Sequence, residues 1–137
     1  ADHAIGDFNL IGGTRGLIIE RDSRQGDPRE EWAENPAEFK RIYLIDLERT
    51  DEQGVLEKIA YIDLMDIQDP EGLAPRGTIN GTFNFPFVTI ENVDRVDEST
   101  IVVANDNNYP FSIGRQQDRA DDNELILLDV EDFLNAQ

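Results

Sequence analysis

Short apolar runs bounded by turn residues dominate the chain, and each is about four to eight residues long with its flanks. The runs centre on Leu17–Ile19, Ile42–Ile45, Ile59–Ile62, Thr89–Ile90, Ile101–Val103 and Leu125–Leu128. Several are rich in β-branched residues, and clusters of Gly, Asp and Ser separate them. Because runs of this length are too short for helices, the pattern predicts strands along most of the chain.

One short helix is predicted between two of these strands. Asp27 occupies the N-cap position, Pro28 the first helical position and Glu30 the third. Asn35 precedes a proline, which ends a helix because the residue before proline avoids the α region. The sequence therefore predicts a helical insertion over 28–33, with a further turn in the tail over 130–135.

Two parts of the chain resemble each other. The segment LIIERD (17–22) aligns with IVVAND (101–106) at an offset of 84, and IYLIDL (42–47) aligns with LILLDV (125–130) at 83. Each copy has a strand, an acidic motif, a polar loop and a second strand. We interpret the copies as two blades of a β-propeller, each blade being an antiparallel sheet of four strands. A small β-sandwich with similar strands is the alternative.

The predicted fold is thus all-β, with about two propeller blades that are incomplete alone. The first blade spans 5–64 and holds the helical insertion, and residues 65–88 form a long surface loop. The second blade spans 89–130 with three evident strands, followed by a short tail over 131–137. Because each blade buries both sheet faces against neighbours, two blades leave two faces open. We expect further blades of the same parent protein or of another chain to cover them, and the second blade's missing outer strand to come from the parent's N-terminus.

The charge and composition of the chain exclude several classes of function. Thirty acidic residues face twelve basic ones, and a net charge of -18 argues against nucleic acid as a partner. The chain has no Cys, which excludes thiolate chemistry, and no apolar run near the roughly 20 residues that a membrane span needs. The single histidine, His3, lies near the first residue, so a Ser-His-acid triad is a poor candidate.

Acidic and amide side chains gather at predicted strand ends. Carboxylate and amide oxygens are the ligands that calcium prefers. The candidate metal ligands are Glu20, Asp22, Glu91, Asn92, Asp106 and Asn107. They do not have the spacing of an EF-hand, so a site would be assembled from separate strands. The alternative is that these residues cap strands and form turns.

Two arginines are candidates for holding a phosphate. Arg21 lies within the first acidic motif, and Arg115 follows the second. With no nucleophile at hand, a hydrolase built from these residues would use metal-held water against a phosphoester. Pairing of Arg21 with a neighbouring carboxylate is the structural alternative.

Longer motifs carry a family resemblance. FPFVTIENVDRVDESTIVVANDNNYPFSIGR (85–115) and DDNELILLDV (121–130) resemble the C-terminal portion of the esterase-like activity of phytase family. GLIIERDSRQGD (16–27) and FKRIYLIDL (39–47) resemble its preceding blade. The resemblance implies a secreted, phytase-like β-propeller several hundred residues long.

The resemblance also implies calcium as the ion and phosphoester hydrolysis as the activity. Glu91 matches the family's "IE" position, Asp106 and Asn107 its "DN" position, and Glu20 and Asp22 its "ERD" position. A non-catalytic extracellular propeller, which binds partners or uses calcium only for rigidity, is the alternative. The same scaffold serves either role, so fold alone does not decide between them.

Overall fold

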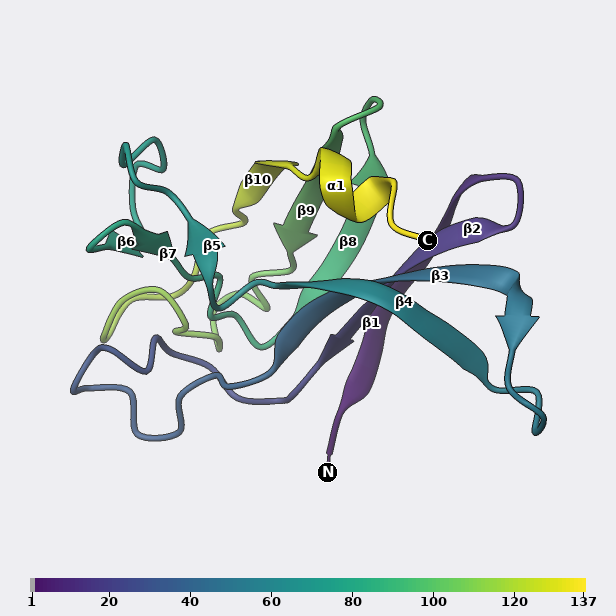
Figure 1. Ribbon diagram of the computed structural model, residues 1–137. Coiled ribbons are helices and arrows are strands. Elements are labelled where there is room, and N and C mark those ends of the chain that lie inside the picture. Colours follow the sequence, from purple (N-terminus) through teal and green to yellow (C-terminus); the bar gives the residue numbers. More distant parts are fainter. Residues whose placement is uncertain (1) are drawn as a thin grey trace.

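The computed structural model describes residues 2–137. Within that range the chain is nearly all-β, with ten strands in three antiparallel sheets and one short helix (Figure 1). The first sheet has the order β1 (Ala4–Gly12), β2 (Arg15–Arg21), β3 (Lys40–Thr50) and β4 (Leu56–Asp63). The second sheet has the order β10 (Leu125–Asp129), β9 (Thr100–Asn105) and β8 (Ile90–Arg95). Every predicted apolar run lies in one of these strands, with Thr89 one residue before β8.

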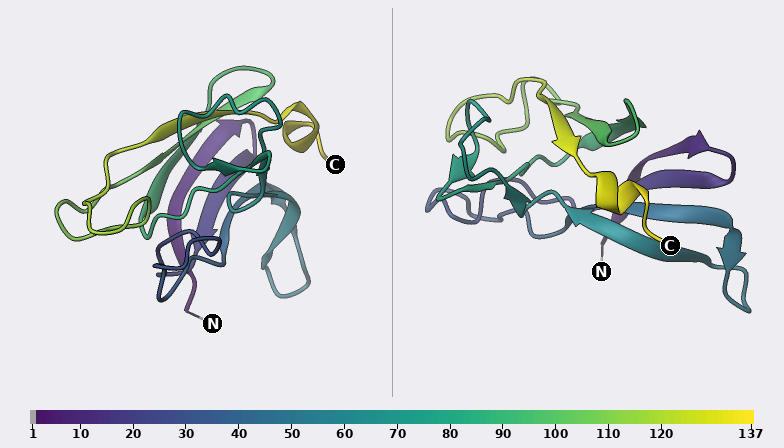
Figure 2. Two further views of the ribbon diagram at one scale, coloured as in Figure 1. Left: turned by 90° about the vertical axis from the view of Figure 1, so that its left-hand side faces the viewer. Right: turned by 45° about the horizontal axis from the view of Figure 1, so that its top comes forward.

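The two sheets meet along β1 and β8, which are edge strands of their sheets. The approach is close enough that a Cβ atom at Gly6 of β1 would lie 2.1 Å from the carbonyl oxygen of Ile90. A glycine is therefore required at this crossing. Figure 2 shows the first and second sheets diverging from the side where these strands meet.

Two side chains of β1 form hydrogen bonds with backbone groups at the edge of β8. The carboxylate of Asp7 accepts a hydrogen bond from the backbone N–H of Val93 at 3.0 Å. Asn9 donates its side-chain amide to the carbonyl oxygen of the same residue. Since β8 pairs with β9 on its other side, these contacts supply partners for backbone groups that a neighbouring strand would otherwise bind.

The core lies between the two sheets. In the first sheet Leu17, Ile19, Ile42 and Leu44 are fully buried, and Val93, Ile101 and Val103 of the second sheet belong to the same cluster. Burial of this much apolar surface is what stabilises the pair of sheets.

The segment 65–88 differs from the predicted surface loop. It forms a small third sheet of β5 (Ile67–Gln68), β7 (Thr82–Phe83) and β6 (Thr78–Ile79), and β6 and β7 meet at an Asn80-Gly81 turn with positive φ at both residues. Its alternate phenylalanines, Phe83, Phe85 and Phe87, are buried in the core. The Gly, Pro and Asn content suggests a loop, but the three aromatic rings fill the space between the sheets.

The predicted helix over 28–33 is absent from the structure, and turns occupy that stretch. Hydrogen bonds run from the N–H of Glu30 to the carbonyl of Asp27 and from Ala33 to Glu30, each spanning a single turn. The Asp27 carboxylate binds the side chain of Arg29 as well as its N–H. A segment this short does not nucleate a helix without support from packing, and here its capping residue is engaged by its neighbours.

The helix that does form, α1 (Glu131–Leu134), lies in the tail where a turn is predicted. Leu134 is buried in the core, and α1 contacts β4. Arg15, at the start of β2, donates to the carbonyl oxygens of Leu134 and Ala136. Among residues 2–137 no helix has the length and apolarity to cross a bilayer.

The two sheets share a topological arrangement. β1 and β8 run in the same direction, and each sheet continues from that strand in chain order. In the first sheet Leu17 pairs with Leu44; in the second, Ile101 pairs with Leu128 and Val102 pairs with Leu127. The strand register therefore does not keep the predicted offsets of 84 and 83 together, because residues 101 and 127 are not paired. A one-residue shift matters because it exchanges the two faces of a strand.

Candidate functional site

Three long connections lie at one end of the sheets. They span 22–39 after β2, 64–89 after β4 and 106–124 after β9, and Figure 1 shows them together on the left. The predicted acidic motifs all lie at this end, because β2 and β9 finish there and β8 begins there.

A hollow of about 680 Å³ opens beside the start of β8 and the end of β9. Glu91, Asn92 and Asp106, three of the predicted metal ligands, line it. Asn105, Asn123 and Glu124 also contribute to its wall. The structure thus brings together ligands from two predicted motifs that are separated by a strand.

Arg21 lies next to this hollow. Its Nη2 atom is 3.6 Å from Oε1 of Glu91, which is the carboxylate pairing named as the structural alternative. The Nε atom of Arg21 is buried and has no hydrogen-bond partner within the described part of the chain. The guanidinium therefore places positive charge beside a candidate ligand.

The residues of the "DN" position, Asp106 and Asn107, have different roles. Asp106 lines the hollow and accepts the N–H of Asn108 through Oδ1 at 2.9 Å. Asn107 instead accepts the N–H of Tyr109 at 3.2 Å, and its own N–H donates to Oδ1 of Asn123 at 2.9 Å. Asn107 is therefore placed to stabilise the turn and does not line the hollow.

The two carboxylates of the first acidic motif lie outside the hollow. Glu20 pairs with Lys58 on the side of the first sheet that is turned away from the second sheet. Burial works to raise the pKa of Glu20, but its contacts with Lys58 and His3 together lower it. Asp22 is buried and pairs with Lys40 at 2.7 Å.

The pair between Asp22 and Lys40 organises the loop over 22–39. Lys40 is fully buried, and its Nζ atom also donates to the carbonyls of Asp22 and Arg24, each at 2.9 Å. Oδ2 of Asp22 accepts the N–H groups of Glu38 and Phe39. Burial lowers the pKa of Lys40 to about 8 even though Asp22 opposes the shift. Burial works to raise the pKa of Asp22, but Lys40 and the backbone donors outweigh it and lower that pKa.

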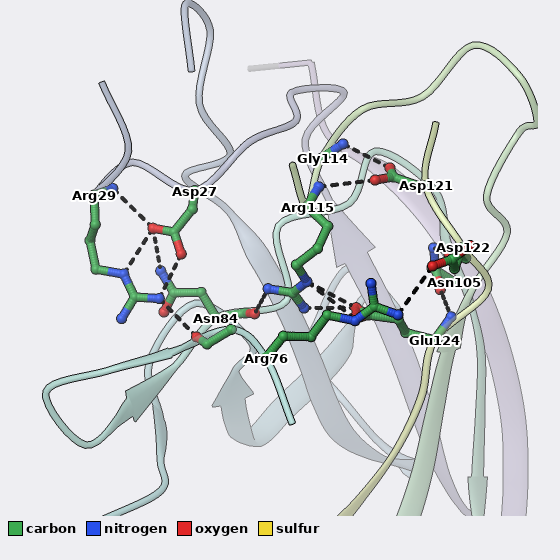
Figure 3. A network of polar contacts seen from close by, with 11 residues as sticks. Asp27, Arg29, Arg76, Asn84, Asn105, Gly114, Arg115, Asp121, Asp122 and Glu124 are labelled. Carbon is green, nitrogen blue, oxygen red and sulfur yellow. Dashed lines mark hydrogen bonds and ion pairs between the residues drawn. The ribbon is translucent and has the colours of Figure 1, made fainter. Parts of the chain in front are cut away.

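Arg115 lies at the centre of a second polar network, which Figure 3 shows. Its Nη2 atom is 2.8 Å from Oε2 of Glu124, and its Nη1 atom donates to the carbonyl of Asn84 at 3.0 Å. The guanidinium carbon lies 5.4 Å from the ring centre of Phe83 and 5.1 Å from that of Phe87. This candidate phosphate-binding residue therefore joins the loop over 106–124 to the segment over 64–89.

The same network continues into the third loop. Arg29 grips the Asp27 carboxylate with Nε at 2.8 Å and Nη2 at 2.6 Å, and Nδ2 of Asn84 donates to Asp27 at 3.2 Å. On the opposite side Arg76 contacts Glu124 at 3.1 Å. The network is a continuous bridge between all three connections at this end of the molecule (Figure 3).

A buried carboxylate, Asp121, supports the network from the side. It accepts the N–H groups of Gly114 at 2.8 Å and Arg115 at 2.9 Å. Burial raises the pKa of Asp121, although these two donors and the Arg115 charge oppose the shift. Sequence reasoning missed Asp121 and Lys40, because one acid in an acidic loop and one lysine before a strand carry no signal of burial.

The metal-binding capacity of the chain is limited. Across residues 2–137 no three Asp, Glu or His side chains are grouped closely enough to hold a metal ion. The hollow offers the carboxylates of Glu91 and Asp106, with the Asn92 amide beside them. A complete coordination shell would need ligands beyond these.

Taken together, the fold defines an all-β protein of two adjacent antiparallel sheets with a loop cluster at one end. The chain matches the phytase-like family, described as "esterase-like activity of phytase", over residues 1–109. It belongs to that family. No curated protein and no solved structure matches the chain. The matched range includes Glu91 and Asp106 and leaves Arg115 outside.

Proposed function

We propose that this chain forms part of a calcium-dependent, phytase-like phosphoester hydrolase and contributes the hollow beside β8 to its site. The observation that carries the proposal is the convergence of Glu91 and Asp106 on that hollow from two strands. Membership of the phytase-like family supports phosphoester chemistry. The remaining ligands and the remaining blades come from other parts of the same propeller.

The donor set suits calcium in kind. Calcium takes six to eight oxygen ligands, and carboxylates and amide carbonyls are typical among them. Glu91 and Asp106 would hold the ion from this chain, and the ion would lower the pKa of bound water and polarise the phosphoryl oxygen. Arg21, whose Nε is unpaired, would help to balance the negative charge of a bound phosphoester.

Secretion fits the composition. A net charge of -18 keeps an extracellular protein soluble and raises the local concentration of divalent cations. The absence of Cys is compatible with any redox compartment, so the proposed extracellular or periplasmic location depends on the family.

A second candidate is a non-catalytic propeller that binds partners or serves as a structural module. This alternative is favoured because two residues that could bind phosphate or a metal ion in a hydrolase are already held in ion pairs. Arg115 is engaged by Glu124 and Asn84, and Asp22 by Lys40. In this alternative, calcium at the hollow would rigidify the loops without turning over a substrate.

The test uses the complete propeller, assayed on a phosphomonoester and a phosphodiester with and without a chelator. Hydrolysis predicts chelator-sensitive turnover that falls at least about tenfold in Asp106→Asn and Glu91→Gln. The matched control is Asp118→Asn, an exposed acid of the same loop that does not line the hollow. We expect this control to retain turnover.

Two results separate the candidates. Turnover that survives both substitutions would contradict the assignment of the hollow. Absence of turnover on either substrate, together with a chelator-induced fall in melting temperature that Asp106→Asn abolishes, would establish the non-catalytic module instead.

A further inference from the structure

A second concavity lies between two of the long connections. It has a volume of about 400 Å³ and opens between the loop over 22–39, which follows β2, and the loop over 106–124, which follows β9. We call it the loop cleft. All of its lining residues belong to these two loops, so neither sheet contributes to its walls, and it shares no lining residue with the hollow beside β8.

The only tryptophan of the chain lines the loop cleft. Trp32 is partly exposed, and its ring packs over Gly26, where a Cβ atom would lie 3.6 Å from Cζ3 of the indole and 2.8 Å from the Cβ atom of Ala33. The backbone of this glycine is itself fixed. Its N–H donates to the carbonyl of Pro86 at 3.0 Å, and its carbonyl accepts the N–H of Ala37 at 2.9 Å. The loop therefore positions the indole before any ligand binds.

A direct hydrogen bond joins the two loops at the cleft. The backbone N–H of Ile113 donates to Oε1 of Gln25 at 2.9 Å, and both residues line the cleft. The chain after Ile113 is anchored as well, because Asp121 accepts the N–H groups of Gly114 and Arg115. The loop cleft is thus largely preformed, as sites for small molecules usually are.

Four uncharged polar side chains line the loop cleft beside the indole. They are one hydroxyl and three amides, Ser23, Gln25, Asn35 and Gln117. A side-chain amide offers two N–H donors and one acceptor oxygen, and a hydroxyl group both donates and accepts. Arg24 also lines the cleft, but its Nη1 atom lies 2.6 Å from Oε2 of Glu38. The lining therefore offers mixed donors and acceptors next to one aromatic ring.

This combination suits a sugar ring. The C–H groups on one face of a pyranose form an apolar surface, and the negative face of an aromatic ring attracts them. The hydroxyl groups around the edge of the same pyranose need both donors and acceptors, which amide side chains supply. A purely apolar ligand would leave the amides without partners, which costs affinity. A volume of about 400 Å³ lies within the range of small-molecule sites.

Charge disfavours anionic ligands at the same place. The Arg24 guanidinium is already balanced by Glu38, and the exposed acids at the rim include Glu34. A net charge of -18 repels nucleotides and phosphorylated sugars further. A neutral ligand avoids this repulsion.

We propose that the loop cleft binds a neutral sugar unit of an oligosaccharide, with its ring stacked on Trp32 and its hydroxyl groups bound by the surrounding amides. The site uses none of the residues of the proposed hydrolase, so it stands or fails independently of phosphoester chemistry.

Titration of the complete propeller with maltose, with cellobiose and with diacetylchitobiose, followed by saturation-transfer NMR of the sugar protons, tests the proposal. We expect at least one of these sugars to bind. Trp32→Ala should weaken that binding at least about tenfold, whereas Trp32→Phe, which keeps an aromatic face, should stay within about threefold of the wild type. The control is Phe111→Ala, which removes an aromatic side chain that is 83% exposed in the same loop cluster but does not line the cleft. Its affinity should be unchanged.

Gln117→Ala provides a second test that does not depend on the indole. Gln117 is exposed, so its loss should leave the fold intact while weakening sugar binding about threefold. Absence of binding by all three sugars would overturn the proposal, and so would unchanged affinity in Gln117→Ala or in a folded Trp32→Ala protein. Binding of benzyl alcohol in place of the sugars would also overturn it, because that result identifies an apolar ligand. Sugar binding that persists in Asp106→Asn, or in a protein without phosphoester turnover, would leave the loop cleft assigned even if the hydrolase is wrong.

Discussion

At the residue scale, ion pairing decides what each charged side chain is available to do. Asp22 and Arg115 have the residue types of a metal ligand and a phosphate clamp, yet both lie in buried pairs. Removing one partner of a buried pair leaves an uncompensated charge, which costs about 3–5 kcal/mol. Exposed pairs such as that of Arg119 with Asp122 contribute far less.

Asp22→Asn tests the buried pair through its pH dependence. The pKa of Asp22 is lowered in the folded protein, so its contribution is fully present above the ordinary value near 3.8 and is lost as pH falls through the folded-state pKa. We expect the wild type to exceed the variant by about 3–5 kcal/mol near neutral pH and the difference to shrink below pH 4. Urea unfolding of the complete propeller at several pH values measures this difference.

Asp121→Asn serves as a control, because its effect on stability should change with pH in the opposite direction. Burial raises the pKa of Asp121, so its ionisation weakens the fold as pH rises from its ordinary value through the folded-state pKa. The stability of the wild type relative to this variant should therefore fall with rising pH. Parallel pH profiles for Asp22→Asn and Asp121→Asn would contradict these assignments.

At the scale of the elements, long-range polar contacts hold the connections in place. Few strand hydrogen bonds reach the loops over 22–39 and 106–124, and the network around Arg115 links both to the segment over 64–89 (Figure 3). The planar guanidinium suits this task because it binds a carboxylate with two parallel N–H groups.

Arg115→Lys tests whether the network orders these loops. A lysine keeps the charge but loses the two-pronged contact with Glu124 and the packing between the rings of Phe83 and Phe87. We expect faster amide hydrogen exchange across 77–87 and 114–124, with the strands of the first sheet unchanged. The matched control is Arg119→Lys, an exposed arginine of the same loop. Equal exchange in the two variants would show that Arg115 does not order the loops.

At the scale of the whole molecule, both outer faces of the sheet pair expose large apolar side chains among charged ones. The outer side of the second sheet exposes Leu125 and Leu127, and the outer side of the first carries Ile5, Phe8 and Tyr61, which are 68%, 46% and 55% exposed. Blade-like repeats gain stability from their neighbours, and a core shared by two sheets lacks the contacts that a closed ring provides.

We expect residues 1–137 expressed alone to lack cooperative thermal unfolding or to self-associate. Circular dichroism and sedimentation at physiological salt measure the two properties. Leu127→Lys should reduce association without changing the dichroism, because this apolar side chain is 63% exposed. A stable monomer with a sharp melting transition would contradict the expectation.

Sequence reasoning succeeded where local pattern is decisive. Short β-branched runs are incompatible with helices and alternate along a pleated strand, so strands such as β2, β3 and β9 were predictable. The family motifs also located Glu91 and Asp106, which share the hollow. The prediction of a helix over 28–33 was wrong, because Asp27 caps the N–H of Arg29 but only single turns follow it in so short a segment.

By itself the sequence determined the all-β class and the family, since each depends on residue order over a short range. Only the tertiary structure decided that Asp22 pairs with Lys40 and that Arg115 joins two of the loops. It also decided that Leu125 and Leu127 remain exposed. Those outcomes depend on strand register and on contacts between distant segments. A shift of one residue exchanges buried and open faces, and a carboxylate becomes a ligand or a structural partner according to what the fold places beside it.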